Sequence, residues 1–146
     1  MRALVQRVSR ACVRVAAPDR AGTLETIARI GPGLVVLLGV APADDEQTAD
    51  RLAEKVRALR VFADAAGRMN DAVGEREILC VSQFTLYADT RHGNRPGFGG
   101  AAAPELAEPL YERVCERLDA ARGRFGAHME IELTADGPVT ILLEVT

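Results

Sequence analysis

Alternating apolar and polar positions near the start of the chain predict a β-strand over residues 3–15. The apolar positions of its second half are Ala11, Val13 and Val15. A period of two is typical of a strand with one face against a core and the other in water. The turn-forming residues that follow are Pro18, Asp19 and Gly22. A β-branched stretch over residues 23–30 then predicts the second strand of a hairpin.

A continuous apolar run over residues 34–40 predicts a central strand that is covered on both faces. Another short apolar run, residues 78–81, leads directly into the polar sequence SQFTL at 82–86. Polar residues at the point where the chain leaves the core often carry function. We therefore expect functional groups at the end of this second strand.

Two segments have the apolar spacing of amphipathic helices, residues 45–62 and residues 104–121. Asp44 or Asp45 can cap the first helix through its carboxylate. In the second segment, Pro104 is acceptable in the first turn. Pro109 predicts that this helix either starts after it or is kinked there, because proline lacks the N–H that a helix interior needs.

The C-terminal residues predict a terminal β-hairpin, because an alternating stretch from residue 129 precedes a turn at 135–138 and a second apolar stretch at 139–145. The whole pattern has about seven strand signals and two helices that do not alternate strictly with strands. This favours an α+β fold with a curved, largely antiparallel or mixed sheet. A length of 146 residues predicts a single domain over residues 1–146, since domains have roughly 150 residues.

Composition and charge restrict the cellular location and the binding partners that we expect for this chain. Hydrophobic residues make up 48% and charged residues 27% of the chain, and the longest apolar run is far below the ~18–20 residues that span a bilayer. Arginines interrupt the apolar residues of the N-terminus, unlike a signal peptide, so we expect a cytoplasmic protein with no membrane partner. With a net charge of −3, the chain lacks the strongly positive surface that is typical of proteins that bind duplex nucleic acid. We therefore expect no DNA partner, while local recognition of a nucleic-acid end stays open.

Motif searches predict neither a metal nor a cofactor. The two histidines, His92 and His128, stand alone, and Cys12, Cys80 and Cys115 have no zinc-type spacing. No phosphate loop, GxGxxG or GxSxG sequence is present. A nucleophile pair of Cys80 with His92 is disfavoured, because a cysteine within an apolar run is usually a small buried hydrophobe.

Three polar sequences remain as candidates: SQFTL, the loop 89–96 with its two arginines, and residues 136–140. Each has a structural alternative. Ser82 and Thr85 could satisfy backbone groups at a strand end, and the loop could simply be solvated rather than bind an anion through its arginines. The Gly-Pro sequence could be an ordinary trans turn, since few X-Pro bonds are cis.

Taken together, SQFTL, the ADT…GNRP loop and the C-terminal GPVT resemble the D-aminoacyl-tRNA deacylase family. Further segments in the family's order include ALVQRV at 3–8, GLVVLLGV at 33–40, DDEQ at 44–47, KVRALRVF at 55–62 and GRF at 123–125. The resemblance therefore spans the chain. One departure is Ala135, where the family usually has an Asn that can brace the turn through its own backbone.

The resemblance implies a D-aminoacyl-tRNA deacylase-like fold and a homodimer that hydrolyses the ester between a D-amino acid and the 3′-terminal adenosine of tRNA. Glycyl-tRNA, as mischarged on tRNA-Ala, is also a substrate of the family. The tRNA 2′-hydroxyl would assist the reaction, so the protein mainly positions the ester and stabilises charge on its carbonyl oxygen. No cofactor is implied.

The resemblance also assigns roles to particular residues. The pocket and oxyanion shell, with no conventional nucleophile, would consist of Ser82, Gln83, Phe84 and Thr85. Gly137 and Pro138 would form a cis bond, enter the pocket of the partner subunit and collide with an L side chain. Phe125 and Met129 would lie near the terminal adenine, or else be core residues. Arg7 would brace the Gly-Pro turn.

Two other functions are compatible with the sequence. One is a non-catalytic dimeric module that binds RNA ends, because none of these residues is an obvious acid or base. The other is a deacylase of relaxed chirality that edits L-alanyl-tRNA. Proteins of that second kind differ in both signatures, so the intact Ser82-Gln83-Phe84 and Gly137-Pro138 sequences favour the D-specific enzyme.

Overall fold

The structure, a computed structural model, describes residues 1–16 and 22–146; the predicted turn residues Pro18 and Asp19 lie outside them. Its elements in chain order are β1 (Arg2–Ala16), β2 (Leu24–Ile30), β3 (Gly33–Gly39), α1 (Glu46–Ala58), β4 (Phe62–Ala63), β5 (Met69–Asp71), β6 (Glu77–Ser82), the 3-10 helix η1 (Phe84–Tyr87), α2 (Pro104–Leu118), β7 (Ala121–Arg122) and β8 (Met129–Glu144). The predicted strands near the N-terminus, the central strand and both helices are therefore present.

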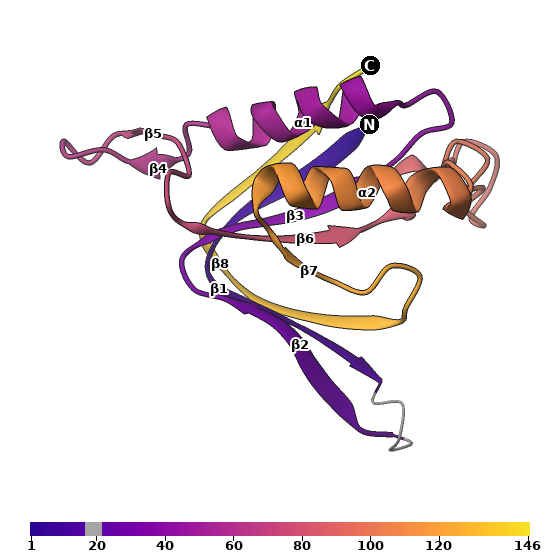
Figure 1. The fold of residues 1–146 in the computed structure, drawn as a ribbon, viewed down its shortest axis with the longest axis horizontal. Helices are drawn as coiled ribbons and strands as arrows, with labels where there is room; N and C mark the ends of the chain where they lie inside the picture. Colours follow the sequence, from indigo (N-terminus) through magenta and orange to yellow (C-terminus); the bar gives the residue numbers. More distant parts are fainter. Residues whose placement is uncertain (17–21) are drawn as a thin grey trace.

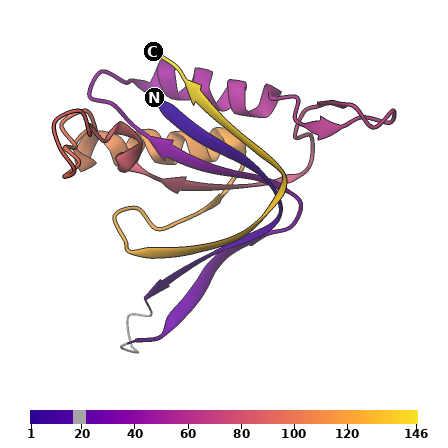
Figure 2. The ribbon, with the colours of Figure 1, turned by 180° about the vertical axis from the view of Figure 1, so that it is seen from behind.

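The long strand β1 organises the main sheet. One edge of β1 pairs antiparallel with β3 through residues 2–8 and with β2 through residues 11–16. Its other edge pairs with β8 along nearly the whole length. β6 then joins β3, and β7 joins β6, both in parallel. The sheet bends where β1 passes from β3 to β2, and β8 follows the bend (Figures 1 and 2). The predicted α+β class with a mixed, curved sheet is confirmed.

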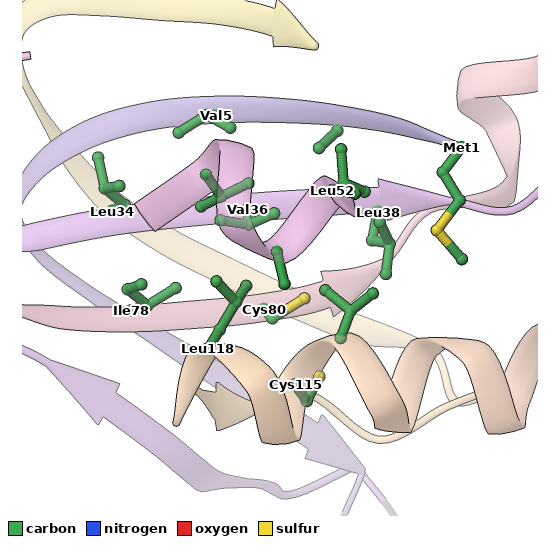
Figure 3. Packing of buried hydrophobic residues seen from close by; sticks show 14 of the residues in the cluster. Met1, Val5, Leu34, Val36, Leu38, Leu52, Ile78, Cys80, Cys115 and Leu118 are labelled. Atoms are coloured by element: carbon green, nitrogen blue, oxygen red, sulfur yellow. The ribbon is translucent and has the colours of Figure 1, made fainter. Parts of the chain in front are cut away.

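Two apolar clusters hold the sheet, one on each of its faces. Helices α1 and α2 cover one face (Figure 1), where Leu34 and Val36 of β3 are fully buried among the side chains drawn in Figure 3. The alternate residue Val35 points into the second cluster, inside the bend, with Val13 and Leu79. Strand β3 is thus covered on both faces, as its continuous apolar run predicts.

Helix α1 begins as predicted and ends earlier than predicted. Asp45 is the N-cap and accepts a hydrogen bond of 2.8 Å from the backbone N–H of Thr48, which satisfies one of the free donors of the first turn. Asp44, the other candidate cap, instead binds the N-terminal amine at 2.6 Å. The helix ends at Ala58 because Leu59 has extended backbone, with ψ of 122°.

Helix α2 begins at Pro104 and runs through Pro109. Of the two alternatives for Pro109, a helix start after it is therefore wrong. Pro104 occupies the first turn, where no N–H donor is needed, and Leu110 and Tyr111 hold the segment after Pro109 in the core. Asp119, in the left-handed conformation with φ of 50°, ends the helix.

The predicted C-terminal hairpin is wrong, because residues 129–144 form the single strand β8. Both halves of β8 pair with β1, and the register shifts between them so that residues 135–140 lie opposite residues 6–8 of β1. The turn chemistry around Gly137 produces an exposed bulge rather than a chain reversal. The strand does not fold back on itself because its partner is β1.

Candidate functional site

The carboxyl end of β6 opens into a cavity of about 560 Å³. Its walls come from the first half of α2 and from the segment 125–129 between β7 and β8, which meet at one end of the molecule (Figure 1). The wall is mostly apolar, with residues such as Leu38, Val40 and Ala107. A cavity of this size and character is typical of a small-molecule site that a few polar groups orient.

Three of the four pocket residues predicted within SQFTL line the cavity: Ser82, Gln83 and Phe84. The backbone N–H of Gln83 donates to the carbonyl of Leu38 at 2.7 Å, which fixes the chain where it leaves the sheet. The side-chain amide of Gln83 donates to Oγ1 of Thr85. Within the described chain the lining does not include Thr85, which is exposed. The structure therefore brings Thr85 against Gln83 rather than into the wall.

An exposed pair of aromatic rings stands at the cavity. The rings of Phe84 and Phe98 pack edge to face with centroids 5.0 Å apart, and both residues line the cavity. Their exposed fractions are 56% and 41%, which leaves flat apolar surface available to a ligand. Phe98 was not among the predicted site residues. Phe98 and Phe84 stand at the two ends of a loop, and no periodic pattern in the sequence predicts that they come into contact.

Phe125 and Met129 both line the opposite wall of the cavity. Phe125 is half-buried and packs its ring against Tyr111, with centroids 5.8 Å apart. The Met129 sulfur accepts a hydrogen bond of 3.4 Å from the backbone N–H of Arg124. A Cβ on Gly123 would lie 2.8 Å from that sulfur. Both predicted residues therefore contribute to the core and to the cavity wall.

Tyr111 connects the cavity walls and was missed at the level of sequence. Its hydroxyl donates to the carbonyl of Cys80 in β6 at 3.0 Å and lies 3.4 Å from the carbonyl of Gly123. The backbone N–H of Gly123 also donates to the Cys80 carbonyl, at 3.1 Å. Burial raises the pKa of Tyr111 far above its ordinary value, so the hydroxyl stays protonated and remains a donor. The only sequence signal is its place on the apolar stripe of α2.

All three cysteines are buried and free. A hydrogen bond with Cys115, together with burial, raises the pKa of the Cys80 thiol well above its ordinary value. A protonated, buried thiol is a poor nucleophile. Cys80 therefore contributes packing and a backbone carbonyl to the site, as the apolar run around it indicates.

The Gly137-Pro138 sequence lies away from this cavity in the exposed bulge of β8, and its peptide bond is cis. Arg7 of β1 lies beside the bulge. Its Nε–H donates to the carbonyl of Asp136 at 3.1 Å and lies 3.2 Å from the carboxylate of the same residue. Another of its N–H groups donates to the carbonyl of Val61. Of the described residues that line the cavity, none is Arg7, Gly137 or Pro138.

No group of three or more metal-ligating side chains occurs among residues 1–16 and 22–146. Over the same part of the chain, none of the helices has the length and apolar character needed to cross a membrane. The described lining of the cavity combines apolar walls with the polar side chains of Ser82, Gln83 and His128.

The fold and the site define a single-domain α+β protein with a ligand cavity at the carboxyl end of a central strand. The sequence matches the family described as D-Tyr-tRNA(Tyr) deacylase over residues 4–144. Proteins named D-aminoacyl-tRNA deacylase from Symbiobacterium thermophilum and Salmonella enteritidis are 56% and 51% identical to this chain. Each match covers 99% of this chain, and 95% and 100% of the respective relative. The chain belongs to the D-Tyr-tRNA(Tyr) deacylase family, and the resemblance found in its sequence is confirmed.

Two solved structures share this fold. A protein described as c-Myc DNA Unwinding Element Binding Protein superposes with a TM-score of 0.88 at 40% identity, covering 99% of this chain and 98% of that one. A probable eukaryotic D-amino acid tRNA deacylase superposes with a TM-score of 0.79 at 15% identity, covering 97% of both chains. The second match concerns the fold alone.

Proposed function

We propose that this protein hydrolyses the ester bond of D-aminoacyl-tRNA and releases the free D-amino acid and the tRNA. The observation that carries the proposal is the end of β6, where Ser82-Gln83-Phe84 opens into an apolar cavity of about 560 Å³ in a chain of this family. Relatives more than half identical over nearly their whole length are named for this activity. We assign the activity to the cytoplasm, and its partner is the aminoacylated 3′ end of tRNA.

The terminal adenosine is proposed to lie against Phe125 and Met129. Single-stranded bases are usually held by stacking on flat side chains, and a thioether makes favourable contacts with aromatic rings. Tyr111 supports this wall through its ring contact with Phe125 and its bond to the β6 backbone. The base would thus be held at a fixed distance from Ser82 and Gln83.

The ester is proposed to react without a nucleophile from the protein. Water adds to the ester carbonyl, the 3′-oxygen of the ribose leaves with a proton, and the 2′-hydroxyl of the same ribose assists that transfer. Ser82 and the backbone N–H groups of Phe84 and Thr85 stabilise the negative charge that develops on the carbonyl oxygen. Two features support this account: the buried thiol of Cys80 stays protonated, and Thr85 is engaged with Gln83.

Selection against L-amino acids is proposed to depend on a second copy of the chain. The exposed Gly137-Pro138 bulge lies outside its own cavity, so it can act on the ester only in the cavity of a partner subunit. Gly137 has φ of +127°, and a Cβ there would lie 2.9 Å from the Val139 side chain and 3.1 Å from Arg7, which keeps the turn free of a side chain. An L side chain would collide with this turn, whereas D-amino acids and glycine would not. Glycine mischarged on tRNA-Ala would therefore be removed as well.

Turnover of substrate tests this proposal against a protein that only binds RNA ends. D-tyrosyl-tRNA in hundredfold excess over the purified protein should be deacylated completely. Phe84→Ala should lower kcat/KM because it removes the exposed ring at the cavity. Binding of the tRNA with release limited to one equivalent per site, or with none, would reject the enzyme and support the binding module.

A further inference from the structure

The loop between η1 and α2 projects from the rim of the cavity. Asp89 and Gly97 exchange two backbone hydrogen bonds of 2.7 and 2.8 Å, which close the neck of the loop. Phe84 precedes the neck, Phe98 follows it, and both line the cavity while their rings pack together. The loop therefore starts and ends at the cavity, at the N-terminal end of α2 (Figure 1).

One positive charge of this loop is free. Arg91 is bound to Asp89 by two hydrogen bonds, from Nε at 2.9 Å and from Nη2 at 2.6 Å. The hydrogen bond with Arg91 lowers the pKa of Asp89, so the two form a neutral ion pair. Arg95 is exposed, and over the described residues it takes part in no ion pair.

The arginines on the opposite side of the cavity are compensated. Arg124, next to Phe125, lies 3.6 Å from the carboxylate of Glu25. Arg122, at the end of β7, lies 4.0 Å from the carboxylate of Glu116. Among the described arginines of these two sides, the one without an ion pair is therefore Arg95, on the side of the η1–α2 loop.

We propose that Arg95 binds the phosphodiester backbone of the tRNA 3′ end, next to the nucleoside held in the cavity. This inference rests on the proposed function. An RNA chain whose last adenosine occupies the cavity has to leave through the rim, and it carries one negative charge at each phosphate. The guanidinium fork matches two phosphate oxygens at once. With a net charge of −3 the protein as a whole repels RNA, so a local cation at the rim is needed.

Two substrates test the proposal. One is D-tyrosyl-tRNA, and the other is 3′-O-D-tyrosyl adenosine, which has the same ester but no phosphate. Arg95→Gln should raise KM for the tRNA about tenfold at low salt, the loss expected for one charge-assisted bond, with kcat unchanged. It should leave both constants for the adenosine ester unchanged. The slope of log KM against log salt should fall by about one. Arg95→Lys should recover part of the affinity, because an ammonium still binds phosphate as a point charge.

Arg68→Gln is the matched control. Its side chain is 78% exposed and pairs with Asp64 in the β4–β5 region, at the other end of the molecule (Figure 1). The Arg68→Gln substitution should leave kcat and KM unchanged for both substrates. An unchanged KM for the tRNA in Arg95→Gln, or an equal rise for both substrates, overturns the phosphate contact. Wild-type protein that hydrolyses neither substrate overturns the proposed function itself, and the inference with it.

Discussion

Thr85 lies next to the cavity, but its hydroxyl is held by the amide of Gln83. We expect Thr85→Ala to keep substantial deacylation of D-tyrosyl-tRNA, with kcat within about fivefold of wild type. The loss would come from the freed Gln83 side chain rather than from a missing nucleophile. Single-turnover rates measure this, with circular dichroism to verify the fold. Near-total loss in a folded variant would make Thr85 a nucleophile.

Arg7 holds the backbone of the Gly137 turn from the neighbouring strand. Its side chain is only 17% exposed, so its removal leaves the Asp136 carbonyl without a partner and the turn less fixed. Arg7→Ala should therefore raise the hydrolysis of L-tyrosyl-tRNA at least tenfold while D-tyrosyl-tRNA is still deacylated.

Arg10→Ala is the matched control for this prediction. Arg10 lies on the same strand and also reaches β8, where it donates to the hydroxyl of Thr134 at 3.2 Å. It makes no bond to residues 136–138 in the described part of the chain. The ratio of the hydrolysis rates of D- and L-tyrosyl-tRNA should be unchanged in this variant. If the Arg7→Ala variant discriminates between L- and D-tyrosyl-tRNA as well as the Arg10→Ala variant does, Arg7 does not position the turn.

At the scale of elements, an ionic cluster joins the two helices over the sheet. Asp50 of α1 accepts two hydrogen bonds of 2.8 Å each from Arg113 and two more, of 3.0 and 2.9 Å, from Arg117 of α2. These bonds lower the pKa of Asp50 far below its ordinary value. A carboxylate with a lowered folded-state pKa stabilises the protein above its unfolded pKa, and this contribution is lost as pH falls toward the folded value.

The expected consequence is a loss of stability below about pH 4. The urea midpoint of wild type should fall between pH 5 and pH 2 more steeply than that of Asp50→Asn, and the two midpoints should converge as pH decreases. Asp45→Asn serves as a comparison for the other carboxylate of this helix whose pKa is lowered, in this case by hydrogen bonds from Thr48, and its amide still caps the helix. Parallel curves for wild type and Asp50→Asn would show that this cluster has no part in acid unfolding.

The elements differ in how well the sequence predicted them, for physical reasons. Local periodicity predicted β1, β3 and α1 correctly, because each of these elements packs either one face or both faces against a core. The predicted hairpin in β8 was wrong because strand pairing is not local. The same alternation and turn residues suit either a hairpin or a bulged strand, and the available edge of β1 decides between them.

The candidate site was predicted unevenly for a similar reason. Ser82, Gln83 and Phe84 stand at a strand exit that the change from apolar to polar residues marks, and they do line the cavity. Tyr111 and Phe98 were not predicted as site residues. Their roles arise from contacts with Cys80 and with Phe84, which only the folded chain brings close.

At the scale of the whole molecule, the proposed selection against L-amino acids needs two copies of the chain. The cavity and the Gly137-Pro138 bulge lie in different parts of one subunit, so we propose that a complete site combines the cavity of one copy with the bulge of the other. We expect light scattering to give a dimer. We also expect two variants to complement each other: one with Gly137→Ala and Pro138→Ala, the other with Gln83→Ala and Phe84→Ala.

The bulge variant alone should lose its selectivity and hydrolyse both the D and the L ester, whereas the cavity variant alone should hydrolyse neither. A mixed dimer has one site in which both contributions are intact. Random pairing of equal amounts after mild unfolding and refolding places half of the intact cavities in mixed dimers, so hydrolysis of the L ester should fall to about half of that by the bulge variant alone, while hydrolysis of the D ester stays unchanged. Self-mixed samples of each variant are the control. Mixed dimers that form without lowering hydrolysis of the L ester would mean that the bulge does not act across the interface.

The most direct test of the account uses three esters of one tRNA, with D-alanine, glycine and L-alanine. Single-turnover hydrolysis rates of the wild-type protein then show how hydrolysis depends on the presence and the configuration of the amino-acid side chain, because the tRNA is the same in all three esters. The D-alanyl and glycyl esters should be hydrolysed rapidly, and the L-alanyl ester at least a hundredfold more slowly. Equal rates for D- and L-alanyl-tRNA, or sparing of the D-alanyl ester, would contradict a site that excludes L side chains.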